Sequence, residues 1–186
     1  MSATRNQVRI IAGRYRRRLL SFPDQPGLRP TPDRVRETLF NWLGQELYGW
    51  TCLDLFAGSG ALGFEAASRE AKRVVMVEKS RVAVASLRAN RQLLGAEEIE
   101  VVEADANLYI RNSRERFDLI LLDPPFDSDL LEALLPQARE RLADDGLLYC
   151  EARRLPALDG WQIVREAKAG QVHCVLLQVA QLGPKE

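Results

Sequence analysis

The sequence predicts an α/β fold with a mostly parallel sheet of seven strands, and three observations support this. From residue 51 onward, short apolar runs alternate with segments of helical periodicity. The first five runs are apolar on both faces, which is typical of buried parallel strands flanked by helices. The last two runs are separated only by a short Lys-Ala-Gly turn, which predicts an antiparallel hairpin at the C-terminal end.

The individual elements can be placed from the same pattern. Strands are expected at residues 51–55, 73–77, 99–102, 117–122, 147–151, 161–167 and 171–180. Helices are expected between them at residues 61–70, 80–94, 107–112 and 129–142, and Gly95 is expected to close the second of these helices.

The residues before position 51 predict a smaller N-terminal part. Residues 7–12 and 15–22 can form the two strands of a hairpin, with the turn at Gly13 and Arg14. A loop rich in proline and glycine follows. We therefore expect two parts, a basic arm over residues 1–30 and a larger body over residues 31–186.

One helix is expected between the arm and the first strand of the sheet. Thr31 followed by Pro32 is typical of a helix start, with the threonine as the N-cap and the proline in the first helical position. Apolar residues then recur at helical spacing as far as Leu47, and Gly49 is predicted to end the helix.

The charge is unevenly distributed along the chain. The net charge is zero, but residues 1–36 contain nine arginines and two acids, a net charge of +7 that the rest of the chain balances. Arginine can bind phosphates and guanine edges through two parallel hydrogen bonds. The arm therefore predicts a polyanionic partner, although a solvated surface with scattered ion pairs is the alternative. The expected nucleic-acid contacts are Arg9, Arg14, Arg16, Arg17, Arg18, Arg29 and Arg34.

The sequence lacks the features of membrane-spanning, secreted and metal-binding proteins. No apolar run approaches the roughly 20 residues that a membrane span needs, and the polar first residues do not resemble a secretory signal. Cys52, Cys150 and Cys174 stand singly within apolar runs, so we expect buried free thiols and no metal site. These features together predict a cytoplasmic protein.

Candidate ligand-binding residues follow the ends of four predicted strands, where open α/β sheets bind their ligands. Asp54 precedes a loop with glycines at positions 58, 60 and 63, and Glu78 and Asp105 follow the next two strands. Asp123 opens the sequence Asp-Pro-Pro-Phe after the fourth strand. Glycines let the backbone approach a ligand closely, and a carboxylate such as that of Glu78 can accept hydrogen bonds from ribose hydroxyls.

The glycine spacing also fits a dinucleotide-binding loop, because Glu78 lies 20 positions beyond Gly58. Two features favour a different ligand. A pyrophosphate would not require the extra carboxylate of Asp54, whereas an amino-acid ammonium group would. A hydride-transfer enzyme also has no evident need for Asp-Pro-Pro-Phe. The dinucleotide reading and a purely structural turn remain the alternatives.

Longer stretches of the chain resemble a known family. RIIAGRYRRRLL, RPTPDRVRETLFNWL, DLFAGSGALGFEAASR and LLDPPF together are similar to the RsmD family of class I S-adenosylmethionine-dependent methyltransferases. The resemblance covers nearly all of the chain and implies a Rossmann-like fold. Members of the family often have Trp and Gly where Tyr15 and Arg17 stand here. The resemblance implies methylation of the exocyclic N2 of a guanine in 16S ribosomal RNA, within the small ribosomal subunit or an assembly intermediate.

The resemblance also implies roles for individual residues. Asp123, Pro124 and Phe126 are the expected catalytic residues: the Asp123 carboxylate and the Pro124 carbonyl accept the two N–H bonds of the target amine, and Phe126 stacks on the base. The expected contacts to S-adenosylmethionine, and to its product S-adenosylhomocysteine, are Asp54, Phe56, Ala57, Gly58, Gly60, Glu78, Lys79, Asp105, Ala106 and Asp123.

Two further functions are compatible with these motifs. The same chemistry could serve adenine N6 in DNA or a side-chain amide in a protein, although the short arm leaves little room for a separate DNA-recognition domain. A non-catalytic RNA-binding module is the third possibility, and the intact set of Asp54, Glu78 and Asp123 argues against it.

Overall fold

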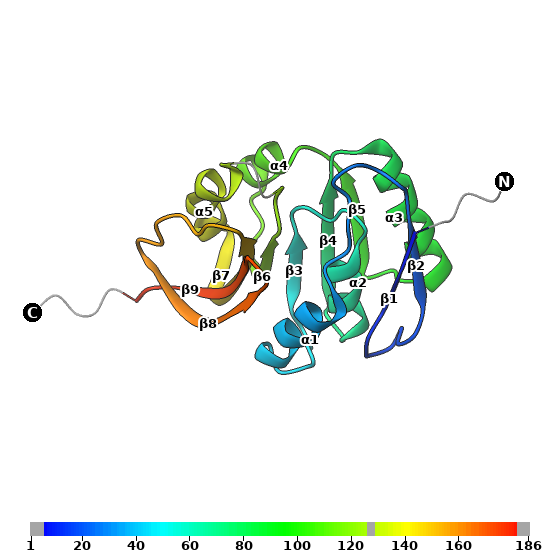
Figure 1. Cartoon of the computed structure of the whole chain (residues 1–186), viewed down its shortest axis with the longest axis horizontal. Coiled ribbons are helices and arrows are strands. Elements are labelled where there is room, and N and C mark those ends of the chain that lie inside the picture. The colour runs from blue at the N-terminus through cyan, green and yellow to red at the C-terminus, as the bar shows by residue number, and fades with distance from the viewer. Residues whose placement is uncertain (1–5, 126–128, 182–186) are drawn as a thin grey trace, which may run out of the picture.

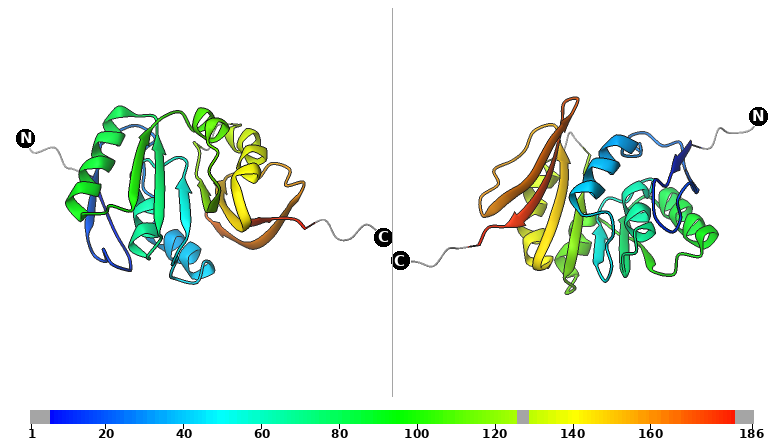
Figure 2. Two further views of the ribbon diagram at one scale, coloured as in Figure 1. Left: turned by 180° about the vertical axis from the view of Figure 1, so that it is seen from behind. Right: turned by 90° about the horizontal axis from the view of Figure 1, so that it is seen from below.

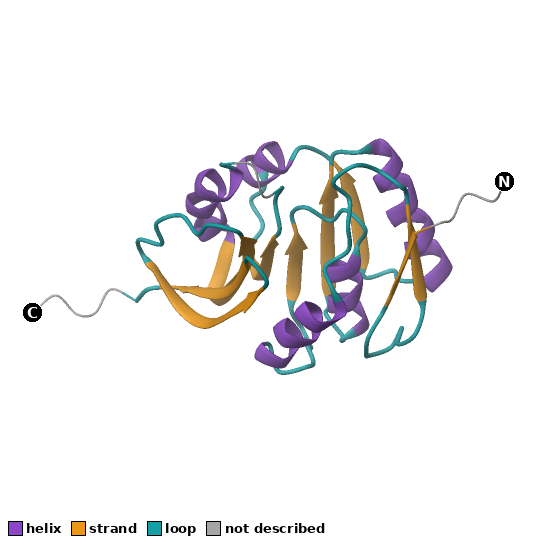
Figure 3. Ribbon diagram, in the orientation of Figure 1, coloured by secondary structure: helices purple, strands orange, loops and turns teal. Residues whose placement is uncertain are grey.

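The computed structural model describes residues 6–125 and 129–181. A large sheet with helices on both faces stands beside a small N-terminal hairpin (Figure 1), and Figure 3 separates the helices from the strands. The strands are β1 (Asn6–Arg9), β2 (Leu19–Phe22), β3 (Thr51–Asp54), β4 (Arg73–Glu78), β5 (Ile99–Glu103), β6 (Phe117–Leu122), β7 (Leu142–Ala152), β8 (Trp161–Ala169) and β9 (Val172–Val179). The helices are α1 (Asp33–Trp42), α2 (Ala61–Ser68), α3 (Arg81–Leu94), α4 (Ala106–Asn112) and α5 (Leu130–Arg141).

The large sheet confirms the predicted fold class. Its seven strands run in the order β5-β4-β3-β6-β7-β9-β8. The first five strands of this order are parallel, and β9 and β8 are antiparallel to their neighbours. The chain moves outward from β3 to β5 and then returns to place β6 on the other side of β3. Ligands in open α/β sheets bind at such a reversal.

Two hydrophobic cores lie on opposite faces of this sheet. One contains apolar side chains of α1, α2 and α3 together with those of the N-terminal hairpin, and the other contains side chains of α4 and α5. The β1–β2 hairpin and the β8–β9 hairpin lie at opposite ends of the sheet (Figure 2). Of the helices that the structure describes, none has the length and apolar character needed to cross a membrane.

The N-terminal hairpin has shorter strands than predicted, because residues 11–15 leave the β1–β2 pair to contact α2. The Arg14 N–H donates to the Ser68 carbonyl at 2.7 Å. Gly13 has a φ of +83°, and a Cβ there would lie 1.9 Å from the same carbonyl oxygen. Arg17 also has a positive φ, +68°, a conformation that favours glycine. The structure thus gives a reason for the glycine that the family often has at this position.

Helix α1 begins later than predicted. Pro32 precedes the helix, Asp33 is its first residue, and no side chain caps the first turn. The prediction of Thr31 as the N-cap is therefore wrong. Thr31 is buried, with 8% of its surface exposed, and its hydroxyl is instead hydrogen-bonded to the Asp123 side chain.

Helix α1 also ends at Trp42 rather than at Gly49. Gly44 and Gln45 both have positive φ, +89° and +73°, which turns the chain out of the helix. Leu47 fits the helical spacing but lies beyond this turn. It is buried there through tertiary packing, and its N–H donates to the Arg69 carbonyl at 2.7 Å.

The C-terminal half differs from the prediction only at the ends of its elements. Strand β7 starts at Leu142, directly after α5, and its register with β6 shifts between Phe117 and Leu119. The β8–β9 hairpin closes around Gly170 and Gln171, because Ala169 pairs with Val172.

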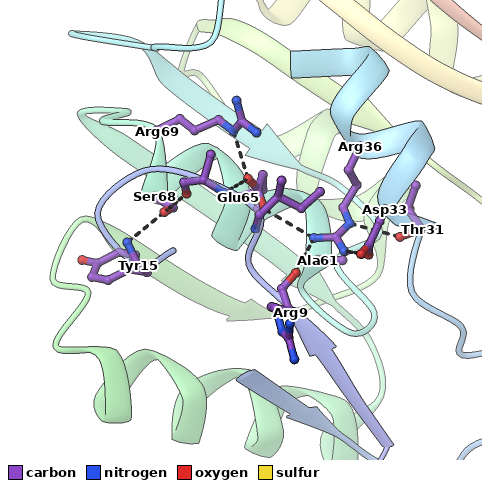
Figure 4. A network of polar contacts seen from close by, with 12 residues as sticks. Arg9, Tyr15, Thr31, Asp33, Arg36, Ala61, Glu65, Ser68 and Arg69 are labelled. Atoms are coloured by element: carbon purple, nitrogen blue, oxygen red, sulfur yellow. Dashed lines mark hydrogen bonds and ion pairs between the residues drawn. The ribbon is translucent and has the colours of Figure 1, made fainter. Parts of the chain in front are cut away.

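A buried carboxylate joins the N-terminal segment to the sheet (Figure 4). Glu65, on α2, is fully buried and accepts four hydrogen bonds. Two come from the arm, from the Ile11 N–H at 2.9 Å and the Ala12 N–H at 3.0 Å. The other two come from arginines, from Arg36 Nη1 at 3.3 Å and Arg69 Nε at 2.9 Å. This one side chain therefore fixes the arm and α1 against α2.

Arg36 extends the network toward the start of α1. Its side chain is fully buried, and besides Glu65 it donates to the Arg9 carbonyl at 2.9 Å and the Thr31 carbonyl at 3.1 Å. It also contacts the Asp33 carboxylate. Every donor nitrogen of this guanidinium thus has an acceptor, which is what burial of an arginine requires.

We expect Glu65→Ala to destabilise the fold strongly and to release the arm. Loss of one partner leaves buried charge uncompensated, which typically costs about 3–5 kcal/mol. Urea denaturation measures the loss, and trypsin cleavage at Arg16–Arg18 under native conditions measures release of the arm. The matched control is Glu70→Ala, which removes only an exposed pair with Arg14 and should cost less than about 1 kcal/mol. Equal effects of the two substitutions would contradict the role assigned to Glu65.

Candidate active site

The predicted site residues follow the ends of neighbouring strands. Asp54 closes β3, Glu78 closes β4 and Asp123 directly follows β6, and β3 pairs in parallel with both β4 and β6. Asp105 comes two residues after β5, the next strand in the sheet. Because these strands run in the same direction (Figure 1), the structure places all four carboxylates along one edge of the sheet.

The glycine-containing loop connects β3 to α2. The Ala57 N–H donates to the Val77 carbonyl at 3.0 Å, which ties the loop to β4. Gly60 has a φ of +85° immediately before α2, and a Cβ there would lie 2.6 Å from the Phe64 ring. The tight turn therefore requires glycine at this position. It leaves the backbone of Phe56 to Gly60 beside the strand ends.

Asp54 lies beneath this loop. Only 2% of its surface is exposed, and its Oδ2 accepts the Gly63 N–H at 3.0 Å. A Cβ on Gly63 would come within 2.9 Å of Met76 and 3.1 Å of the Asp54 carboxylate. The third glycine thus allows α2 to approach the strands closely. The carboxylate stands behind the first turn of the helix.

The pKa of Asp54 is raised from 3.8 to about 7. Burial is the main cause and the nearby Glu78 adds to it, against the lowering effect of backbone hydrogen bonds from Gly63 and Phe56. The charged form is therefore costly in the ligand-free protein. A cationic group placed against this carboxylate would relieve that cost. The site is accordingly suited to an ammonium group.

Glu78 already binds two backbone groups. Its Oε2 accepts the Gly58 N–H at 3.0 Å and its Oε1 accepts the Ser80 N–H at 2.8 Å. A carboxylate has about four acceptor positions, so capacity remains for ribose hydroxyls. The Ser80 hydroxyl is also hydrogen-bonded to the Gln25 side chain at 2.9 Å. The loop before α1 therefore reaches the same strand end, a contact that the sequence did not reveal.

Asp105 caps helix α4, with its Oδ1 accepting the Leu108 N–H at 3.1 Å. It is exposed, as is Lys79, whereas Ala106 is buried in the first turn of α4. The helix cap explains the presence of an aspartate here without any ligand. Its contact with an adenine amino group stays a prediction.

Asp123 is partly exposed at the end of β6, and Pro124 beside it is buried. Burial raises the pKa of the Asp123 carboxyl well above its usual value, and the neighbouring Glu151 and Asp54 raise it further. The hydrogen bond from Thr31 acts in the opposite direction. Phe126, the predicted stacking residue, lies outside the described residues.

Thr31 and Glu151 are parts of this site that the sequence analysis missed. Thr31 was assigned to a helix cap. Glu151 is 5% exposed and follows the apolar run 147–150, so it stands at a strand end as Asp54 and Asp123 do. An acid directly after a buried apolar run was the signal that could have identified it.

All seven arginines predicted to contact nucleic acid are exposed. Arg14 nevertheless forms an ion pair with Glu70 at 2.6 Å, and Arg18 donates to the Leu93 carbonyl at 3.3 Å. Arg36, also part of the basic segment, is buried in the Glu65 network instead. The net positive charge that this segment presents to a partner is therefore lower than the +7 counted from the sequence.

Cys52, Cys150 and Cys174 are buried free thiols. Within residues 6–125 and 129–181, no group of three or more histidine, cysteine, aspartate or glutamate side chains is arranged to hold a metal ion.

We expect Asp54→Asn to remove a pH dependence of stability. A carboxyl with a folded pKa of about 7 and an ordinary unfolded value favours folding most at low pH, and this contribution is lost as pH rises from about 4 to 7. Between pH 5.5 and 8.5 the variant should gain about 2 kcal/mol relative to the natural protein, as measured by urea denaturation.

Asparagine still accepts the Gly63 N–H, so the fold should be retained. Asp24→Asn, which alters an exposed carboxyl in the arm, is the control and should leave the pH dependence unchanged. A parallel pH dependence for Asp54→Asn and the natural protein would show that Asp54 is charged at no cost.

Comparison with known proteins identifies relatives over nearly the whole chain. A family model described as "Conserved hypothetical protein 95" matches residues 8–178. The "Ribosomal RNA small subunit methyltransferase D" proteins of Escherichia coli and Haemophilus influenzae are 43% and 39% identical. The alignments cover 92% of this chain and 90% of the E. coli protein, and 94% and 95% respectively for H. influenzae.

A solved structure agrees with these sequence matches. It is that of an E. coli protein whose name assigns it to the methyltransferases, and it is 42% identical with a TM-score of 0.86. The match covers 94% of this chain and 98% of that one. The fold, the strand-end carboxylates and the sequence matches agree, and the chain belongs to the conserved hypothetical protein 95 family, the RsmD family of methyltransferases that its motifs resemble.

Proposed function

We propose that this protein transfers a methyl group from S-adenosylmethionine to the exocyclic N2 of a guanine in 16S ribosomal RNA. The observation that carries the proposal is the adjacency of β3 and β6. It brings the glycine-containing loop after Asp54 next to Asp123 and Pro124. The proposed donor and acceptor sites therefore adjoin each other at the ends of two neighbouring strands. The names of the relatives supply the RNA class.

The donor side fits the residues present. The buried Asp54 carboxyl is suited to the ammonium group of an amino acid, and the backbone from Phe56 through Ala57 and Gly58 to Gly60 passes above it. Glu78 retains acceptor capacity for ribose hydroxyls, with Lys79 beside it. Asp105 and Ala106 lie at the next strand end, where the adenine would follow. The bound donor supplies a methyl group already activated by its sulfonium charge.

On the acceptor side, Asp123 and the Pro124 carbonyl hold the amine. The lone pair of guanine N2 is delocalised into the ring, and two acceptors on its N–H bonds turn it toward the methyl carbon. The nitrogen lone pair forms the new N–C bond while the C–S electrons stay on sulfur. The nitrogen then loses one proton to the Asp123 carboxylate. A base in folded RNA must leave its stack to reach this position.

The exposed arginines supply the RNA contact. We propose that the arm over residues 1–30 holds the RNA backbone and that the body over residues 31–186 carries out the chemistry. A small ribosomal subunit or an assembly intermediate is the natural substrate of such an arrangement. The cytoplasm is the corresponding compartment.

Asp123→Ala should leave donor binding nearly intact and abolish transfer. Removal of one preorganised acceptor at a reacting centre costs on the order of 100-fold or more in rate. Calorimetry with S-adenosylmethionine and transfer of labelled methyl to 16S RNA or small subunits measure the two properties. DNA and protein substrates serve as parallel samples. A variant with more than half the natural rate, or faster labelling of DNA or protein, would contradict the proposal.

Replacement of Arg16, Arg17 and Arg18 together by alanine should flatten the salt dependence of RNA binding. Each phosphate neutralised contributes about 0.7–0.9 to the slope of log affinity against log salt. RNA binding at several salt concentrations measures the change, and donor calorimetry checks that the body is intact. The matched control replaces three exposed arginines of the body, Arg111, Arg114 and Arg165. Identical slopes for the two triple variants would exclude these arm residues as phosphate contacts.

A further inference from the structure

Two buried ionisable side chains beside the acceptor site have no part in the mechanism above. Tyr149 and Glu151 lie at the end of β7, with 0% and 5% of their surfaces exposed. The Tyr149 hydroxyl donates to Glu151 Oε1 at 2.9 Å. A buried glutamate whose hydrogen-bond partner is a hydroxyl is costly to ionise. A glutamate that is costly to ionise and lies next to the reacting centre therefore requires a functional explanation.

Strand register places Glu151 beside Asp123. Leu122 pairs with Cys150 across β6 and β7, and the next residue of each strand is one of the two acids. Side chains alternate along a strand, so both acids share the face of Leu121 and Tyr149, the face covered by α1 and α2. The two carboxyl groups thus stand side by side at the end of adjacent strands.

The groups that face this pair come from several elements. Asp54 approaches from β3, Cys174 from β9 and the Thr31 hydroxyl from the segment before α1. Burial, followed by the neighbouring Glu151, raises the pKa of Asp123, while burial raises that of Glu151. Each acid receives one hydroxyl hydrogen bond that opposes this, from Thr31 and Tyr149 respectively.

We propose that Asp123 and Glu151 form a carboxyl pair that shares one proton, with Glu151 as the positioning residue that increases the affinity of Asp123 for the proton released by the amine. Two adjacent carboxylates, one buried and one partly buried, cannot both ionise readily, so one proton remains on the pair. Tyr149 occupies Glu151 Oε1, which leaves Oε2 to carry that proton. This proposal rests on the proposed methyl transfer.

The proton balance of the transfer follows from this arrangement. Before transfer the pair carries one proton and one negative charge, with the charge on Asp123. After the N–C bond forms, the nitrogen releases one proton to Asp123, the N–H electrons stay on nitrogen, and the pair becomes neutral. One proton later passes to solvent when the product leaves. The pair thus carries no more than one negative charge at any stage.

The direct test is a ¹³C-carboxyl NMR titration of the ligand-free protein, which needs no activity. In Glu151→Gln, which retains shape and can still accept from Tyr149, the Asp123 titration should move to lower pH by at least about one unit, because the neighbouring acid is gone. Glu166→Gln, an exposed acid paired with His173 on the outer strands, should cause no shift. An unchanged Asp123 titration in Glu151→Gln overturns the proposal.

Tyr149→Phe provides a second variant if Glu151→Gln does not fold. Loss of its hydroxyl should make Glu151 hold the shared proton to higher pH and let Asp123 ionise at lower pH. Unchanged titration of both acids would overturn the proposal equally.

The activity measurement separates this proposal from the function on which it rests. In single-turnover methylation, Glu151→Gln should move the acidic limb of the pH–rate profile by the same amount as the NMR titration, with donor affinity unchanged. Absence of methyl transfer by the natural protein, together with the NMR shift, would refute the function and retain the carboxyl pair. Normal transfer without any shift in either measurement would refute the pair alone.

Discussion

The buried Glu65 carboxylate is the constraint on which the placement of the N-terminal segment depends. It accepts two backbone N–H groups of the arm and two arginine side chains. Arg36, one of those arginines, also donates to the Thr31 carbonyl, and the Thr31 hydroxyl binds Asp123. A short series of hydrogen bonds therefore runs from α2 to the acid at the proposed acceptor site. The arm that would hold RNA and the residue that would hold its base are positioned by the same side chain.

The protein contains two kinds of desolvated acid. One kind stabilises the fold, and the other forms the candidate active site. Glu65 is buried in ion pairs with two arginines, whose charges offset the cost of desolvation. Asp54, Asp123 and Glu151 have raised pKa values because burial is their largest influence, and neighbouring acids raise the values of Asp54 and Asp123 further. Such groups respond to an incoming cation, whereas a fully paired carboxylate does not. Perturbed acids gathered at the carboxyl edge of a sheet are typical of functional sites.

The sequence predicted the sheet well because most of its strands are continuous apolar runs, a property that local pattern alone reveals. It predicted the positions of Asp54, Glu78 and Asp123 for a related reason, since strand ends follow from the strands themselves. The end of α1 was wrong because Leu47 has helical spacing but is buried by tertiary packing after Gly44 and Gln45 turn the chain. The hydroxyl of Thr31 likewise bonds to Asp123, 92 positions further along the chain, and does not cap the helix that begins beside it. Contacts of this range have no signature in local sequence.

The arginine-rich segment shows how one residue type can serve two purposes within a few positions. Arg34 is exposed on the first turn of α1, and Arg36, two residues later, is buried on its inner face. A helix turns by about 200° over two residues, so neighbouring arginines of α1 face opposite directions. In the buried one, every nitrogen of the guanidinium donates to an acceptor in the protein, and none of its surface is exposed to a ligand. Only the exposed arginines of this segment can therefore bind a polyanion. The buried Arg36 contributes indirectly, because it fixes the segment that carries them against the body.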